Sequence, residues 1–321
     1  MSKTSRTNIK VVGGIGNQLF GFFFGALVSN LLQTRLSLDT RLIKFGSNKG
    51  RSSIFQEIKM DGQSFDTVNS QATNEILLNY ADFYKRIYWK FTNFFGRSIS
   101  EEECLAPKFK FKANQSYKGY FQNWFYVDKF AATMPNVILK PMKNSTRYSE
   151  ELDKLKIQSP ICIHLREGDY LNFPEIYRLI PVKYFDYCLK LEKSKNSNRP
   201  IWIFTEDADS LKFYDERFVG LATRIIDRKT GLTDIESFML MTQCKTLIAT
   251  NSTYSLWAAW FVWHNGNTAY VPLQSYISGV SDELMDERWN RYDFEKDILY
   301  PGKFNQEKYD KLEREFLSKF T

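Results

Sequence analysis

The second half of the chain alternates short apolar runs with helix-length segments, and this alternation limits the fold more than any other feature. Five of the runs are predicted to be strands, at residues 161–165, 201–205, 222–226, 246–250 and 269–271. Helices are expected at 147–156, 181–193, 209–214, 234–244 and 252–263. Strands that alternate with helices imply right-handed crossovers and a mostly parallel sheet, so the predicted fold class is α/β.

The first half begins with a similar unit. Residues 9–12 are predicted to form a strand, followed by an apolar helix that runs to about residue 34 and a second strand at 36–39. A further strand is expected at 119–124. The aromatic and basic segment 80–95 is expected to be a helix that packs on the domain, or else a face for a membrane or an acceptor.

A chain of 321 residues favours two domains. The polar helix before residue 161 suggests a boundary near residue 150, which gives domains 1–150 and 151–321. A tail helix predicted at 306–320 is counted with the second domain.

The loop after the first strand reads Gly13-Gly14-Ile15-Gly16-Asn17-Gln18. It is not the G-x-G-x-x-G pattern of dinucleotide-binding proteins. It combines a backbone that a ligand can approach closely with two amide side chains at a helix N-terminus, where free N–H groups attract anions. The alternative is a tight turn in which Asn17 is the N-cap.

Composition narrows the class of ligand. Lys and Arg outnumber Asp and Glu by 44 to 37, and the net charge of +7 suits a phosphate-bearing ligand or an anionic membrane surface. Nucleic acid is not expected, because the chain has no basic helix, zinc-knuckle spacing or RNP-like strand. The four cysteines show no C-x-x-C spacing and are predicted to be reduced thiols, and two histidines are too few for a His-rich metal site.

The chain is expected to be cytoplasmic. Its longest early apolar stretch, residues 19–32, is too short to span a bilayer and is not followed by a signal-peptide cleavage site.

The strand predicted at 161–165 ends in chemically active residues. His164, Arg166, Gly168 and Asp169 follow one another within a few positions. Because open α/β sheets bind ligands at the carboxyl ends of their strands, this turn is a candidate ligand site. A salt-bridged turn without any ligand is the alternative.

Two later strand-to-helix junctions carry acidic groups. Asp207 and Asp209 form a D-x-D pair that would hold Mg²⁺ or Mn²⁺ on a nucleotide diphosphate, or would cap the helix that follows. Thr233 and Glu236 fit a capping box, which is a structural explanation for the second of these residues.

A further junction reads Asn251-Ser252-Thr253 and precedes a predicted helix. Hydroxyl groups beside free N–H groups suit a diphosphate, although simple N-capping uses the same residues. Together the junctions of both halves favour a nucleotide held between two Rossmann-like domains.

Five ordered blocks of the sequence resemble the bacterial α-1,2-fucosyltransferases of glycosyltransferase family 11. The blocks are residues 13–20 (GGIGNQLF), 119–122 (GYFQ), 164–170 (HLREGDY), 204–207 (FTED), and 240–245 (LMTQCK) running into 251–260 (NSTYSLWAAW). The resemblance implies a GT-B fold, in which two Rossmann-like domains with parallel sheets face a nucleotide-sugar cleft. It also implies an inverting transfer of L-fucose from GDP-β-L-fucose to the 2-hydroxyl of a galactoside, with no metal and no cofactor.

The resemblance also implies roles for individual residues. Arg166 would contact the donor diphosphate and stabilise the departing GDP, with His164 beside it on the nucleotide. The base that takes the acceptor proton would be Asp169 or, as the second choice, Glu175. The other implied donor-binding residues are Gly14, Gly16, Asn17, Asp207, Glu236, Asn251, Ser252 and Thr253.

Three positions depart from the family pattern. Glu167 stands where the family often has a second Arg, and it is expected either to face Arg166 or to face solvent. Ser237 stands where an acid is common, so Glu236 is the candidate to replace that acid. Leu256 replaces the first Trp of a usual pair, which is expected to be a packing change.

The expected acceptor is a galactoside in a surface glycan or O-antigen repeat, and one carried on a lipid diphosphate would bring the protein to the inner membrane as a peripheral protein. Two rival functions stay open at this point. One is a metal-dependent GT-A transferase that uses Asp207 and Asp209, and the other is a non-catalytic nucleotide- or glycan-binding protein.

Overall fold

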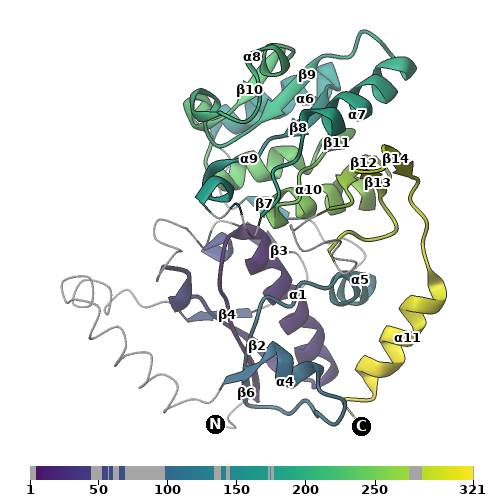
Figure 1. Ribbon diagram of the computed structural model, residues 1–321. Helices are drawn as coiled ribbons and strands as arrows, with labels where there is room; N and C mark the ends of the chain where they lie inside the picture. The colour runs from purple at the N-terminus through teal and green to yellow at the C-terminus, as the bar shows by residue number, and fades with distance from the viewer. Residues whose placement is uncertain are drawn as a thin grey trace. The chain divides into compact units, whose positions relative to one another are not determined.

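The computed structural model (Figure 1) describes residues 5–44, 53–56, 58–60, 65–68, 98–133, 139–141, 145–172, 174, 177–274 and 284–320. The chain divides into two compact units. The first comprises Met1–Gln56, Met60–Ile138 and Gln306–Thr321, and the second comprises Glu57–Lys59 and Leu139–Asn305.

This division differs in two respects from the domains expected from the sequence. Residues 150 and 151 lie inside one helix, α6 (Thr146–Gln158), and the chain passes between the units before that helix. The C-terminal helix α11 (Gln306–Leu317) belongs to the first unit. Its Phe316 ring lies 5.6 Å from Phe125 and 5.7 Å from Phe111, so burial of an aromatic side chain explains the assignment.

The first unit contains a five-stranded parallel sheet in the order β4-β2-β1-β6-β5. Its strands are β1 (Arg6–Lys10), β2 (Arg35–Asp39), β4 (Phe65–Val68), β5 (Ser98–Ser100) and β6 (Gln115–Lys118). Its other helices are α1 (Ile15–Leu31), α4 (Glu101–Leu105) and α5 (Trp124–Thr133). A separate ladder pairs β3 (Ile58–Met60) with β7 (Leu139–Pro141), and apart from Met60 these strands belong to the second unit.

Helix α1 is buried along nearly its whole length and packs directly on β1. A methyl group added at Gly25 would lie only 2.3 Å from Ile9, so glycine permits this close approach. The ring of Phe24 stacks on Phe121 with centroids 3.8 Å apart. Phe121 takes a positive φ of 50° after β6 has ended at Lys118, so the strand predicted at 119–124 is wrong: residues 119–123 form a loop and Trp124 begins α5.

The second unit contains a seven-stranded sheet in the order β10-β9-β8-β11-β12-β13-β14, in which only the last pair is antiparallel. Its strands are β8 (Ile161–His164), β9 (Ile201–Phe204), β10 (Arg224–Ile226), β11 (Thr246–Ile248), β12 (Thr268–Pro272), β13 (Asn290–Asp293) and β14 (Ile298–Tyr300). Besides α6, its helices are α7 (Val182–Lys195), α8 (Glu216–Val219), α9 (Asp234–Met241) and α10 (Thr253–His264).

Both faces of the central strands are covered. Ile161 and Ile163 point into a core shared with Tyr184 of α7, while Trp202 on the opposite face donates a hydrogen bond from its indole N–H to Gln158 of α6. A parallel sheet covered on both faces explains why these strands are apolar throughout. The two units with parallel sheets confirm the α/β fold class and the two Rossmann-like sheets that the resemblance implies.

One helix of the second half is wrongly predicted. Residues 209–214 do not form a helix; a single 3₁₀ turn, η5 (Ala208–Ser210), is followed by an irregular loop. The backbone N–H groups of Lys212, Phe213 and Tyr214 donate to the carboxylate of Glu167 rather than to helical carbonyls. The segment 80–95 lies outside the described residues.

The four cysteines, which the sequence predicted to be reduced thiols, are free, and all four are buried. Among the helices that the structure describes, none is both long enough and apolar enough to cross a membrane.

Candidate functional site

The sheet of the second unit changes direction between β8 and β11. From β8 the chain builds outward through β9 and β10, and then returns to place β11 on the other side of β8. The carboxyl ends of parallel strands at such a switch point form a crevice that binds ligands in open α/β sheets. The residues that follow β8, β9, β10 and β11 are therefore the candidate site.

His164 is the last residue of β8 and only 5% of it is exposed. Its Nδ1 shares a 3.1 Å hydrogen bond with the hydroxyl of Thr250, which follows β11, so the bond spans the switch point. Burial, together with the positive charge of Arg166, lowers the pKa of His164 to about 3. The ring is therefore neutral at physiological pH and acts as a hydrogen-bonding group.

Arg166 lies just beyond the strand, in contact with an acid from the neighbouring strand end. Its Nη1 is 3.3 Å from Oε2 of Glu206, which follows β9. The other oxygen of Glu206 is bound by the guanidinium of Arg228, which follows β10. One carboxylate thus holds two guanidinium groups from two other strand ends.

Gly168 is required for this arrangement. Its φ of +47° favours glycine, and an added Cβ would lie 3.1 Å from Oε2 of Glu206. Asp169 and Glu175 are the predicted bases. Asp169 lies in the 3₁₀ turn η4 (Gly168–Asn172) with its side chain outside the described part of the structure, and Glu175 lies outside the described residues altogether.

Glu167 faces neither Arg166 nor solvent, so both expectations for it are wrong. It is 4% exposed, and its carboxylate accepts backbone N–H groups from Lys212, Phe213 and Tyr214 at 2.6–3.3 Å. A carboxylate is acceptor-only and has enough lone pairs for all of these donors. Glu167 therefore anchors the loop that follows β9, a role that an Arg cannot fill.

The junction after β11 carries the predicted phosphate-binding residues. Ser252 is the N-cap of α10, and its hydroxyl accepts the N–H of Ser255. Thr253 is the first residue of the helix, and Asn251 donates from its amide to the carbonyl of Arg178 at 2.8 Å. The capping alternative is confirmed here, and phosphate binding stays a prediction for the same residues.

The two acids predicted for ribose or guanine recognition also have structural partners. Asp207 caps η5 by accepting the N–H of Asp209. Glu236 forms the predicted capping box with Thr233 and also accepts the N–H of Ser145 at 3.1 Å. Burial raises the pKa of Glu236, but these hydrogen bonds outweigh it and lower the pKa overall, so the side chain is a charged anchor between α9 and the start of α6.

Both side chains of the D-x-D pair, Asp207 and Asp209, also have partners within the protein. Asp209 pairs with Lys229, and within the described residues no three His, Cys, Asp or Glu side chains gather into a group that would hold a metal ion.

The first unit has its own switch point, between β1 and β6. Asn17 lies within the first turn of α1, where its side-chain oxygen accepts a 2.8 Å hydrogen bond from Gln122 of the loop after β6. The N-cap is Gly14, and it makes no side-chain cap bond, so the N-cap interpretation of Asn17 is wrong. Gly16 is buried in the same turn.

A comparison with known protein families decides what kind of protein this is. The model of glycosyl transferase family 11 matches residues 8–278. The chain belongs to glycosyl transferase family 11. It is therefore a glycosyltransferase, as the resemblance of its sequence blocks implied.

Two curated relatives from Escherichia coli are similar over most of their length. An alpha-1,2-colitosyltransferase is 24% identical over 262 residues, which cover 78% of this chain and 86% of the relative. The O-antigen biosynthesis glycosyltransferase WbnK is 22% identical over 302 residues, which cover 86% of this chain and 97% of the relative. Among solved structures, the fucosyltransferase NodZ from Bradyrhizobium aligns with a TM-score of 0.47 at 13% identity, covering 81% of this chain and 94% of NodZ.

Sequence reasoning missed Thr250 and Arg228, which belong to none of the sequence blocks. It included Gln122 in the 119–122 block but not its contact with Asn17, because that partner is distant in sequence. The available signal was their position after the carboxyl end of a parallel strand: β11 and β6 lie at switch points, whereas β10, which precedes Arg228, is the edge strand of its sheet.

Proposed function

We propose that the protein transfers L-fucose from GDP-β-L-fucose to the 2-hydroxyl of a galactoside, with inversion and without a metal. The observation that carries the proposal is the position of Arg166, at the switch point of a Rossmann-like sheet in a family 11 glycosyltransferase. The 1,2-linkage named for one relative agrees with it.

The chemistry requires stabilisation of the charge that develops on the departing diphosphate. A guanidinium is always charged and can donate to two phosphate oxygens at once. Arg166 can therefore stabilise the charge on the diphosphate, as Mg²⁺ does in metal-dependent transferases. Direct displacement then gives inversion at the anomeric carbon. In this proposal His164 stays neutral and contacts the nucleotide, while Ser252 and Thr253 contact phosphate at the start of α10.

The acceptor hydroxyl must lose its proton as it attacks. The proposed base is Asp169, on the 3₁₀ turn beside Arg166, with Glu175 as the second candidate. Asn17, Gly14 and Gly16 of the first unit are proposed to contact the donor as well, and Asp207 or Glu236 its ribose or guanine.

A donor screen tests this proposal. Purified protein is incubated with GDP-fucose, GDP-colitose, GDP-mannose or UDP-galactose and with galactosides of different linkage, and products are analysed by mass spectrometry and NMR. Colitose is included because it is L-fucose without the 3-hydroxyl and is named for one relative. Transfer from GDP-fucose to a galactose 2-hydroxyl is expected, and its anomeric configuration reports inversion.

Two outcomes would replace the proposal. Activity that EDTA abolishes and Mn²⁺ restores would favour a metal-dependent transferase using Asp207 and Asp209. GDP binding without transfer to any galactoside would favour a non-catalytic binding protein.

We further propose a cytoplasmic protein that acts on a glycan carried by a lipid diphosphate, for example an O-antigen repeat. The net charge of +7 would support contact with an anionic membrane surface. Sedimentation with vesicles that contain phosphatidylglycerol tests this contact, which salt should weaken. Equal recovery in the supernatant with and without vesicles would contradict it.

A further inference from the structure

The acid Glu206 lies between two cations that the sequence separates widely. Its Oε2 is 3.3 Å from Nη1 of Arg166, and its Oε1 is bound by Nη2 of Arg228. These three residues follow β8, β9 and β10, which are neighbours in the sheet. The cluster is therefore at the carboxyl edge beside the switch point.

The backbone positions Arg228 toward this edge. Its N–H donates to the carbonyl of Glu206 at 3.3 Å, and the N–H of Thr205 donates to Ile226, so the β9–β10 pairing continues past the strand ends. Asp227 then caps the 3₁₀ turn η6 (Arg228–Thr230). The backbone of Arg228 is thus held in place by hydrogen bonds, and its guanidinium contacts the carboxylate of Glu206.

The cluster is open to a ligand. The side chains of Arg166, Glu206 and Arg228 are 27%, 43% and 69% exposed. Ion pairs between exposed groups contribute little to stability, so an anion with more charge can displace the carboxylate at little cost. Two guanidinium groups that share one carboxylate are already spaced to share one phosphate group, which carries more charge and more acceptor oxygens.

We propose that Arg228 is a second cation of the donor diphosphate site, and that Glu206 holds both guanidinium groups until the diphosphate displaces it. The proposal rests on the proposed function, because it assigns the diphosphate of the donor to this edge. The proposal assigns Arg228 to the β-phosphate, which GDP has and GMP lacks, so the two nucleotides together can test this contact. Glu206 is a positioning residue that competes with the ligand.

Calorimetric titration of the full chain with GDP, GMP and guanosine tests this. Arg228→Gln should weaken GDP binding about tenfold, the scale of a lost charge-assisted hydrogen bond, and leave GMP and guanosine within about twofold of the wild type. Glu206→Gln should bind GDP more tightly than the wild type, because the competing charge is gone. Lys229→Gln is the matched control, since it removes the next positive charge from a side chain that pairs with Asp209.

The outcomes separate the two proposals. If Arg228→Gln keeps the wild-type ratio of GDP to GMP affinity, or weakens all three ligands equally, Arg228 is not a diphosphate ligand while the proposed function stands. If Glu206→Gln binds GDP no more tightly than the wild type, the displacement idea is wrong. A wild-type protein that binds none of the three ligands would contradict the proposed function and this inference together.

Discussion

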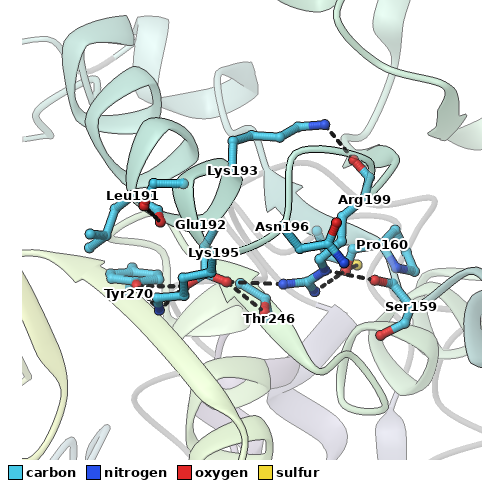
Figure 2. A network of polar contacts seen from close by, with 12 residues as sticks. Ser159, Pro160, Leu191, Glu192, Lys193, Lys195, Asn196, Arg199, Thr246 and Tyr270 are labelled. Atoms are coloured by element: carbon cyan, nitrogen blue, oxygen red, sulfur yellow. Dashed lines mark hydrogen bonds and ion pairs between the residues drawn. The ribbon is translucent and has the colours of Figure 1, made fainter.

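The two edges of the sheet in the second unit each carry a glutamate paired with two cationic side chains, but the two glutamates differ in burial. At the carboxyl edge, Glu206 lies between Arg166 and Arg228; Glu206 and Arg228 are exposed and Arg166 is half-buried. At the amino edge, Glu192 near the end of α7 pairs with Arg199 and Lys195 (Figure 2). The difference is that Glu192 is only 3% exposed.

The carboxylate of Glu192 and the guanidinium of Arg199 are bonded to groups of the protein itself. Glu192 accepts hydrogen bonds from the hydroxyls of Tyr270, at 2.7 Å, and Thr246, at 3.4 Å, in addition to pairing with its two cations (Figure 2). The guanidinium of Arg199 also donates to the carbonyls of Ser159 and Pro160, just before β8. This cluster joins α7 to the starts of β8, β9 and β11, so it is structural.

The comparison shows that burial, rather than residue type, separates a structural ion pair from a binding site. A buried ion pair whose hydrogen bonds all go to protein groups has no donor or acceptor left for a ligand. Removing one member of such a pair leaves an unpaired charge in the protein interior, which is destabilising. An exposed ion pair adds little stability, and a ligand can replace one of its two members at little cost in free energy. The predictions below test this separation, from the largest expected effect to the smallest.

Glu192→Ala should destabilise the protein by about 3–5 kcal/mol, because it leaves the half of Arg199 that faced the carboxylate unpaired. Urea unfolding followed by circular dichroism measures this change. Glu206→Ala is the matched control at the opposite edge and should alter the free energy of unfolding by less than about 1 kcal/mol. Equal effects at the two edges would contradict the comparison.

Arg166→Ala should lower the rate of sugar transfer about 100- to 1,000-fold, the scale seen when one charge-stabilising donor is lost. Its free energy of unfolding should stay close to the wild-type value, because the side chain pairs at an exposed edge. Initial rates with the donor that the screen identifies, together with the urea curve, give both quantities. Near-normal turnover would contradict the role of Arg166.

Glu167→Gln should destabilise the protein by about 1–3 kcal/mol, because an amide has a single acceptor oxygen for the N–H groups of the loop and introduces a buried donor. Urea unfolding checks it, with Glu216→Gln on the exposed surface of α8 as the control. No change in stability would mean that the loop does not depend on the carboxylate.

The pH dependence of stability should also differ between the edges. At the amino edge, burial raises the pKa of Glu192, but bonds from Lys195 and Tyr270 and the charges of Lys195 and Arg199 lower it overall. Its contribution is therefore present above the unfolded pKa of about 4.3 and disappears as the pH falls through the lower folded value.

At the carboxyl edge, His164 has its pKa lowered to about 3, so below about pH 6.5 the unfolded chain binds a proton that the folded protein does not. Stability should fall from about pH 6.5 down to about 3, by at most about 1.4 kcal/mol per pH unit from this group. Thermal unfolding at several pH values should show a shallower fall between pH 6 and 4.5 in His164→Gln, while Glu192→Gln keeps the wild-type slope there. The same slope in all three proteins would contradict the assignment.

Much of the second unit follows from the sequence, because its strands are continuous apolar runs that are buried on both faces. That alternation also places His164, Arg166 and Ser252 at the same edge of the sheet, but the strand order that makes β8 and β11 neighbours at a switch point comes from the structure. The helix predicted at 209–214 fails because a distant residue, Glu167, takes the N–H groups that a helix would use.

The partners of the site residues were harder to predict. Arg228 meets Glu206 only because β9 and β10 are adjacent, and Asn17 meets Gln122 only because β1 and β6 are. The family pattern showed that Glu167 is unusual, but it did not show what Glu167 does. Its partners are backbone N–H groups, which leave no signature in the sequence.

The central claim is that the carboxyl edge binds the donor diphosphate through Arg166, whereas the amino edge only supports the fold. Calorimetric titration of GDP into the wild type, Arg166→Ala and Arg199→Lys, each shown to be folded at the temperature used, tests it most directly. The account predicts at least tenfold weaker binding, about 1.4 kcal/mol, in Arg166→Ala and wild-type affinity in Arg199→Lys. Wild-type affinity in Arg166→Ala would contradict it.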